Sequence, residues 1–473
     1  MALRNQFDDI QSTYPQPTDG VNLRTTPRDL RPTEALLMQN CEVYGTRRIR
    51  RGSQRLNTTS YGSYMGLGGH KFYYGGPNPN SKRLIAYNTT ISTISDIGVE
   101  SQLTTGMTPG QPTYFTTWPI TEKAYISNGS NVLSYYDGTT FGTVTGTNVP
   151  IVRGAVVPII DRLLGITADG IERSGPRLDS VWSANSDWAT FRPQRPGLFT
   201  AMHPYALRGQ DTLTEGVIAL QERAYYHISG QDFGATVDAV TASPGEDTRM
   251  KLIDPTVGTN SPDSLLTVPG VGIFWFTTDL NVFFIPDGQL VGSYIGTNIQ
   301  STGSTPGLES CNTTALRNVW MTYFDHILML GIPSGTNPYA STQWWLDMRV
   351  LRGDSRNRKP VWYGPMIGQT VSRAWVENQN GDNAVYGLEG NANNGLFVYQ
   401  LRVPSRFTDA IGINDIPISL IYQSYFKDFG MPSREKYMQS VHFDMNTFSG
   451  TATVDLVDLN QDIITGVPIE VVS

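Results

Sequence analysis

The chain has 473 residues, of which 39% are hydrophobic and 11% aromatic, with a formal net charge of -7 and an isoelectric point near 5.3. It is too long for one compact core, and its apolar content can repay the entropy of folding, which excludes an intrinsically disordered protein. The acidic balance excludes a protein whose main task is to grip nucleic acid, because phosphate neutralisation needs a basic surface.

Cysteine usage and hydropathy limit the setting of the protein. Cys41 and Cys311 lie far apart in no metal-ligand spacing, so we expect two buried, reduced thiols. No segment approaches the ~20 uninterrupted apolar residues of a membrane helix, and residues 1–14 lack the apolar stretch of a signal peptide. We therefore expect a protein that is made and kept in a cytoplasm without stable membrane insertion.

Residues 1–60 have the pattern of an irregular arm that prolines interrupt. Thr33 is a suitable N-cap and residues 35–38 are apolar, which together predict a short helix from Thr33 to Cys41. Such a segment has little core of its own. We expect it to be ordered by packing on the main domain or on a neighbouring subunit.

A cluster of basic residues ends this arm and consists of Arg47, Arg48, Arg50, Arg51 and Arg55. One interpretation is a solvated hairpin edge on which like charges discourage unwanted strand pairing. The other is a contact site for an acidic partner surface or a DNA backbone, because the arginine fork matches carboxylates and phosphates. The sequence leaves both interpretations open.

Residues 61–402 alternate short apolar runs with tight turns. Ala124 to Ser127 precedes Asn128-Gly129, and Val132 to Tyr136 precedes Asp137-Gly138, which are strong hairpin signals. Similar units recur without a strict motif at 84–97, 124–144, 159–182, 217–233, 271–295, 319–332 and 385–401.

The spacing of these units, together with near-continuous apolar strands such as Gly272 to Phe276, predicts the blades of a β-propeller. The degenerate repeat does not fix the blade number. The glycine-rich stretch Gly66 to Gly69 lacks the context of a phosphate loop and is interpreted as a turn.

After about residue 402 the pattern changes to alternating strands, as in 441–445 and 451–457, which predicts a small β-sandwich or platform over 403–473. The last residues, Val471 to Ser473, have a strand pattern, which leaves open whether the natural chain continues. The expected fold class is therefore all-β: a propeller-like repeat domain, a small sandwich or platform domain and an N-terminal arm.

Catalytic and metal-binding patterns are missing from the sequence. The five histidines, His70, His203, His227, His326 and His442, have no second ligand at the short spacings of metal sites. No Gly-x-Ser-x-Gly elbow occurs, and Asp161, Asp279 and Asp325 stand in or beside predicted turns, where aspartate is common for conformational reasons. We expect no catalytic residues, no metal and no cofactor.

The opening segment resembles phage tail proteins of the nozzle, or packaged-DNA stabilisation, type. The residues that carry the resemblance are Asp19 to Arg24, Pro27, Leu30 to Ala35, Gln39-Asn40 and Arg51-Gly52. It continues more loosely through Val181 to Phe191, Gly216 to Tyr226 and Gly270 to Phe284.

The resemblance implies a propeller with an added β platform, assembled as a closed ring of six copies in the tail or neck of a short-tailed phage. Such a ring surrounds the DNA exit channel, retains the packaged double-stranded DNA, and joins the portal and adaptor proteins to tail fibre or tip proteins. It implies no catalytic residues. An acidic lining is consistent with this role, because each neutralised phosphate would add affinity that slows DNA exit.

Two other functions stay open. A receptor- or glycan-binding tail protein would use exposed aromatic residues such as Trp344 and Trp345, although hydrophobic packing between blades also accounts for that pair. A propeller glycosidase could draw two carboxylates from distant blades and leave no local motif.

Overall fold

The computed structural model describes part of the chain in two units, Met1–Phe426 and Lys427–Ser473. The described residues are 18–25, 29–31, 33–44, 46–75, 80–159, 161–182, 190–205, 207–208, 213–214, 216–229, 249–301, 306–351, 359–379, 382–404, 406–424, 453–457 and 463–468.

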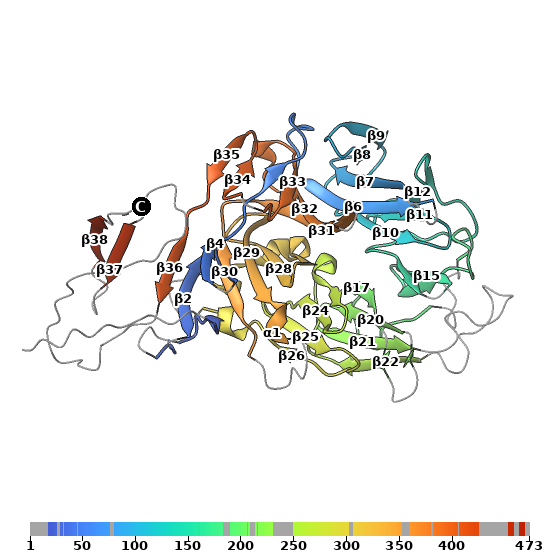
Figure 1. Ribbon diagram of the computed structural model, residues 1–473. Coiled ribbons are helices and arrows are strands. Elements are labelled where there is room, and N and C mark those ends of the chain that lie inside the picture. Colours follow the sequence, from blue (N-terminus) through green and yellow to red (C-terminus); the bar gives the residue numbers. More distant parts are fainter. Residues whose placement is uncertain are drawn as a thin grey trace, which may run out of the picture. The chain divides into compact units, whose positions relative to one another are not determined.

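The first unit consists mainly of small antiparallel sheets, most with their strands in chain order (Figure 1). The first sheet contains β6 (Gly66–Tyr74), β7 (Asn80–Tyr87), β8 (Thr90–Ile94) and β9 (Glu100–Thr104), and the second contains β10 (Tyr114–Trp118), β11 (Lys123–Ser127), β12 (Ser134–Tyr136) and β13 (Phe141–Thr143). The third contains β14 (Val157–Ile159), β15 (Arg162–Ile166) and β16 (Ile171–Arg173).

The next two sheets follow the same plan. The fourth contains β17 (Phe199–Pro204), β20 (Gly216–Gln221), β21 (Ala224–Ser229) and β22 (Arg249–Asp254), with the small hairpin β18 (Leu207–Arg208) and β19 (Leu213–Thr214) inserted after β17. The fifth contains β23 (Leu266–Val268), β24 (Gly272–Phe276), β25 (Val282–Pro286) and β26 (Ser293–Tyr294).

The last sheet joins two four-stranded halves through the pairing of Ala340 with Val371. One half contains β27 (Trp320–Phe324), β28 (Ile327–Pro333), β29 (Ala340–Asp347) and β30 (Trp362–Met366). The other contains β31 (Val371–Gln379), β32 (Asp382–Glu389), β33 (Val398–Leu401) and, from the N-terminal segment, β5 (Gln54–Arg55). The described residues thus form seven blades.

The first strand of every blade contacts the first strand of the next. The contacts run from β6 through β10, β14, β17, β23 and β27 to β31, and β31 in turn contacts β6, so the circle is closed. These strands are the innermost strands of a β-propeller, whose blades surround a central axis. The all-β propeller expected from the sequence is confirmed, and each of the seven recurring sequence units overlaps a different blade.

Two features explain why the sequence folds into blades. The predicted hairpin turns occur as expected, with Gly129 and Gly138 at φ values of 74° and 97° that residues with a side chain rarely adopt. The apolar strand β24 is buried along its whole length, and Trp275 on it contacts Tyr225 of the preceding blade with ring centroids 5.3 Å apart. Burial on both faces is what stacked blades require.

A second layer of strands flanks the blades and joins the two ends of the first unit. It contains a sheet of β1 (Gly20–Val21), β2 (Glu34–Gln39) and β36 (Ile421–Ser424), the hairpin of β3 (Cys41–Tyr44) and β4 (Thr46–Ile49), and the hairpin of β34 (Thr408–Ile411) and β35 (Asn414–Pro417). We call this layer the platform. It combines the N-terminal segment with residues expected to belong to a separate C-terminal domain.

The helix predicted from Thr33 to Cys41 is wrong, because residues 34–39 form the strand β2. This strand pairs with β1 in parallel and with β36 in antiparallel orientation, so backbone partners are supplied on both edges. Ala35 and Met38 are buried. A consecutive apolar run fits a strand as well as a helix, and long-range pairing decides between them.

Helical structure is minor in the described residues. It consists of α1 (Met348–Leu351) and the 3-10 helices η2 (Pro262–Ser264), η3 (Thr297–Ile299), η4 (Leu308–Ser310), η5 (Thr313–Asn318) and η7 (Ala392–Asn394). None of the described helices is long and apolar enough to cross a membrane.

The second unit begins at Lys427, whereas the sequence suggested a boundary near residue 402. Its described residues form the hairpin of β37 (Thr453–Val457) and β38 (Ile463–Pro468), and β37 coincides with one of the predicted alternating strands. The strand expected at 441–445 lies outside the described residues.

Candidate functional site

Arg50 belongs to the predicted basic cluster, and the structure buries it within the platform. Its guanidinium binds the carboxylate of Asp409 through both terminal nitrogens, with Nη1 donating to Oδ1 at 2.9 Å. The side chains of Arg50 and Asp409 are only 6% and 4% exposed. This forked, charge-assisted pair joins the end of the N-terminal segment to β34.

Asn40 holds the other side of Arg50 and lies in the tight turn between β2 and β3, where its φ is 54°. Its Oδ1 accepts hydrogen bonds from Nε of Arg50 at 3.0 Å and from the backbone N–H of Ile367 at 2.9 Å. Its Nδ2 donates to the carbonyl oxygen of Ser419 at 2.8 Å. One asparagine thus connects the N-terminal segment, the sixth blade and the strands after residue 402.

The other arginines of the cluster fall into two groups. Arg51 lies 3.6 Å from Asp325, and Arg55 pairs with Asp415 at 3.4 Å while donating to the carbonyls of Gly412 and Asn414. Arg47 and Arg48 are on β4, and their side chains lie outside the described part of the chain.

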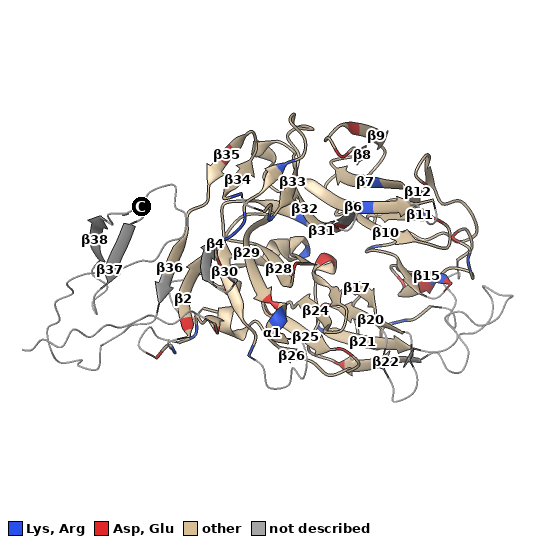
Figure 2. Ribbon diagram, in the orientation of Figure 1, with Lys and Arg blue, Asp and Glu red and all other residues tan. Residues whose placement is uncertain are grey.

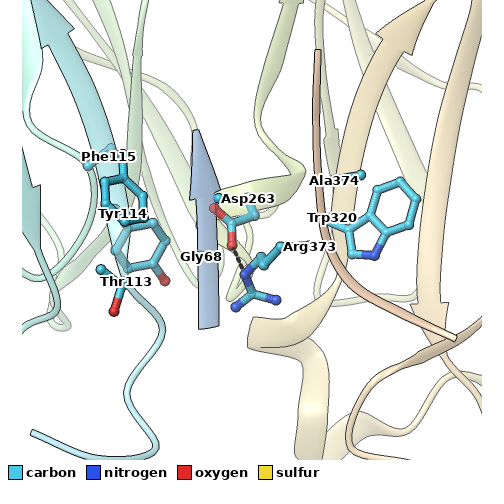
Figure 3. Close-up of a pocket in the computed structure, with 10 residues that line it drawn as sticks. Gly68, Thr113, Tyr114, Phe115, Asp263, Trp320, Arg373 and Ala374 are labelled. Carbon is cyan, nitrogen blue, oxygen red and sulfur yellow. Dashed lines mark ion pairs between the residues drawn. The ribbon is translucent and has the colours of Figure 1, made fainter. Parts of the chain in front are cut away.

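The centre of the propeller contains a small cavity of about 110 Å³, which we call the axial cavity. Residues of several innermost strands and of the loops beside them line it: Gly68, Gly69, Thr113, Tyr114, Phe115, Ala155, Asp263, Trp320, Arg373 and Ala374. Figure 3 shows Asp263 and Arg373 facing each other between Tyr114 on one side and Trp320 on the other.

The glycine-rich stretch at the start of β6 forms part of this wall, so its interpretation as a turn is wrong. A Cβ on Gly68 would lie 2.1 Å from the carbonyl oxygen of Thr113, and one on Gly69 would lie 2.3 Å from the ring of Trp375. The glycines therefore allow adjacent innermost strands to approach one another closely.

Asp263 and Arg373 form the charged pair of the axial cavity, with 2.6 Å between Oδ2 and Nε. Arg373 also donates to the carbonyl of Ser372 at 2.7 Å and to Oδ1 of Asn318 at 3.3 Å. Burial raises the pKa of Asp263, and the charge of Arg373 opposes that rise.

The phenol of Tyr114 adds a third polar group to this cavity. Burial raises the pKa of Tyr114, the nearby carboxylate of Asp263 raises it further, and Arg373 and Arg317 act in the opposite direction. Tyr114 therefore stays protonated at neutral pH, and its hydroxyl can donate a hydrogen bond.

A second charged cluster connects the first and last blades. Both oxygens of the fully buried Glu377 accept hydrogen bonds from Arg83, at 2.6 and 2.7 Å, and Lys71 lies 3.4 Å away. Trp375 donates to the same carboxylate at 2.9 Å. Because Arg83 is on β7 and Glu377 is on β31, this cluster strengthens the junction at which the ring closes.

Of the histidines, His70 and His203 hydrogen-bond to threonines of neighbouring blades, whereas Nε2 of His227 and Nδ1 of His326 are buried without a hydrogen-bond partner among the described residues. Nε2 of His70 lies 2.8 Å from Oγ1 of Thr117, and burial lowers the pKa of His70 to about 4. His442 lies outside the described residues. Trp344 and Trp345 are 0% and 2% exposed, so they form no exposed binding surface for glycans, and packing accounts for the pair.

Metal-binding groups and reactive thiols were also considered from the sequence. Within the described ranges, no group of three or more histidine, cysteine or acidic residues could hold a metal ion. Cys41 and Cys311 are both buried, and burial raises the pKa of the Cys311 thiol to about 12.

Sequence reasoning missed every charged residue of the axial cavity. Asp263 precedes the fifth blade and Arg373 begins the seventh, so no local spacing relates them. The only signal was indirect, since Arg373 stands in a strand that is otherwise apolar or neutral up to Glu377. An isolated charge in an innermost strand identifies a candidate only after the blades have been assigned.

The described residues form a seven-bladed β-propeller with a small polar cavity on its axis. Neither the family models nor the curated proteins contain a match to this chain.

Solved structures of similar fold are β-propeller proteins or complexes. A chain of the crystal structure of BBS1N in complex with ARL6DN has a TM-score of 0.44 and 10% identity, over 76% of this chain and 99% of that chain. The WD40 β-propeller domain of Doa1 has a TM-score of 0.41 and 8% sequence identity, over 75% of this chain and 99% of that chain. YCF48 bound to D1 peptide has a TM-score of 0.40 and 9% sequence identity, over 78% of this chain and 98% of that chain.

Proposed function

We propose that the protein is a structural, non-enzymatic subunit of a phage tail or neck ring of the nozzle type. The ring would surround the DNA exit channel, retain the packaged genome, and connect portal and adaptor proteins to the distal tail. The resemblance of the opening segment to such proteins motivates the proposal.

The observation that best supports the proposal is the position of the residues that carry the resemblance. Asn40 bridges three parts of the first unit, and Gly52 packs so closely on β34 that a Cβ would lie 2.0 Å from the carbonyl oxygen of Thr408. Gly20 packs equally closely on Trp362, at 2.4 Å from its carbonyl oxygen. These residues build the platform beside the propeller, which is the architecture that the resemblance implies.

Charge is consistent with the same role. Figure 2 shows both basic and acidic positions scattered over the described ribbon, which suits a protein that contacts DNA without gripping it. In the basic cluster, Arg50 is buried in its pair with Asp409, so the other four arginines, Arg47, Arg48, Arg51 and Arg55, remain the candidates for a partner or DNA contact.

Electron microscopy of the purified protein and of particles tests the proposal. We expect rings with a central hole, of six copies, and we expect particles that lack the subunit to package DNA and then lose it. A protein that stays monomeric at all concentrations, or particles that retain their genomes without it, would contradict the proposal. Cleavage of a host polysaccharide, or binding on a glycan array, would favour the glycosidase or adhesin instead.

A charge-reversal pair tests the basic cluster separately. The double variant Arg47→Glu/Arg48→Glu should weaken ring assembly or genome retention while the subunit keeps its melting temperature. The matched control is the double variant Lys82→Glu/Arg223→Glu, which reverses two exposed charges on the propeller and so changes the net charge equally. Equal effects of both changes would show that net charge, and no specific contact at β4, is responsible.

A further inference from the structure

The axial cavity holds polar groups whose hydrogen-bonding capacity the described residues leave unfilled. Tyr114 is only 7% exposed and its ring lines the cavity. Among the described residues, Oδ2 of Asp263 and Nε of Arg373 are buried polar atoms without a well-oriented hydrogen bond, and such atoms usually meet a water or a ligand. Asp263 is held by its ion pair with Arg373 and by no hydrogen bond from the described part of the chain.

Arg373 has spare donors beside these groups. Its two hydrogen bonds, to Ser372 and Asn318, use fewer N–H groups than a guanidinium carries. One buried cation, one partly buried anion and one phenol therefore border the same small space (Figure 3). The neighbouring wall is small or aromatic, with Gly68, Ala374 and Trp320.

We propose that the axial cavity is a binding site for a small zwitterion that carries an ammonium group and a carboxylate on neighbouring carbons, as an α-amino acid does. The ligand carboxylate would accept hydrogen bonds from Tyr114 and the free N–H groups of Arg373. The ligand ammonium would donate to Asp263. A ligand with a single charge is attracted by one member of the Asp263–Arg373 pair and repelled by the other, whereas a zwitterion pairs with both.

The volume sets the size of the ligand. The cavity measures about 110 Å³, which is several times the ~10–15 Å³ that one water needs and well below the ~300 Å³ at which drug-sized pockets begin. Glycine or alanine has the right number of atoms. Because so few atoms make contact, we expect a dissociation constant in the micromolar to millimolar range.

Binding is tested on the full chain by calorimetry and by ligand-observed NMR with glycine and alanine. Acetate and methylammonium, which each carry one of the two charges, serve as the comparison ligands. We expect saturable binding of the amino acids, at least about tenfold tighter than either comparison ligand. Equal binding of acetate or methylammonium, or no saturable binding up to tens of millimolar, would overturn the proposal.

Two variants locate the site. Tyr114→Phe removes one hydroxyl and should weaken glycine binding about tenfold or more, since it removes a hydrogen bond to a charged group. Asp263→Asn keeps the shape and should weaken the amino acids while improving acetate. Arg317→Gln is the matched control, because Arg317 is exposed and influences Tyr114 only through its charge.

Folding of each variant is checked by circular dichroism and gel filtration. Glycine affinity that is unchanged in folded Tyr114→Phe and Asp263→Asn, or reduced equally in Arg317→Gln, would refute the assignment of the axial cavity. The result does not depend on ring assembly, so the proposed function and this site can fail independently.

Discussion

Replacing Arg50 by alanine should destabilise the first unit far more than the loss of an ordinary surface arginine. The change removes the forked pair with Asp409 and the hydrogen bonds to Asn40 and to the carbonyl of Ile367. Asp409 would remain buried without its cation. Breaking a buried ion pair from one side costs about 3–5 kcal/mol, whereas most surface substitutions cost less than about 0.5 kcal/mol.

Urea denaturation followed by tryptophan fluorescence measures this free energy of unfolding. The nine tryptophans all precede residue 376, so their fluorescence reports on the first unit and not on residues 427–473. The matched control is Arg317→Ala, which removes an exposed arginine that donates to the carbonyl of Gly110 at 3.3 Å. We expect the control to stay within about 0.5 kcal/mol of the wild type.

Two further variants test the reasoning about Arg50. Arg50→Lys keeps the charge but not the fork, so it should fall between wild type and alanine. The double variant Arg50→Met/Asp409→Leu leaves no buried charge unpaired and should be more stable than Arg50→Ala. A loss below about 1 kcal/mol in Arg50→Ala, with an unchanged denaturant slope, would show that Arg50 behaves as a surface residue.

Two other predictions concern charges inside the propeller. Burial lowers the pKa of His227 to about 4, so this histidine contributes stability above its unfolded pKa near 6.5 and loses it as the pH falls toward 4. Between pH 7 and pH 5 the protein should lose about 2 kcal/mol of its free energy of unfolding through His227. The variant His227→Gln should therefore show a smaller change in the free energy of unfolding over this pH range. The same pH dependence in wild type and variant would refute the burial argument. Glu377→Ala leaves Arg83 buried without its carboxylate and should lower the free energy of unfolding by about 3–5 kcal/mol. Asp96→Asn is the comparison, because the side chain of Asp96 is 64% exposed, and it should cost less than about 1 kcal/mol. Similar losses in these two variants would contradict a special role for the buried carboxylate.

The local signals of the sequence were enough to predict the blades. Asn128-Gly129 and Asp137-Gly138 specify turns through backbone conformations that depend on neighbouring residues only. The apolar run in β24 likewise reports burial on both faces. Such features need no knowledge of distant parts of the chain, and for this reason all seven repeated units could be located.

Long-range partners could not be predicted in the same way. Arg50 and Asp409 are 359 residues apart, and Arg83 and Glu377 are 294 apart, so no spacing in the sequence connects them. The strand β2 was mistaken for a helix for the same reason, since the strand β36 that pairs with it lies near the other end of the first unit. The axial cavity depends on several blades at once and emerges only when the ring is assembled.

The strand β5 has a consequence for how the protein is made. It pairs with β33, and Arg55 lies opposite Tyr399, so about 340 residues separate the two partners. During synthesis at about 5–20 residues per second, β5 waits roughly 17–70 seconds before its partner strand has been translated. During that time β5 has no partner strand, and unpaired strand edges favour incorrect strand pairing. The pairing of β5 with β33 therefore cannot form until the propeller has been translated.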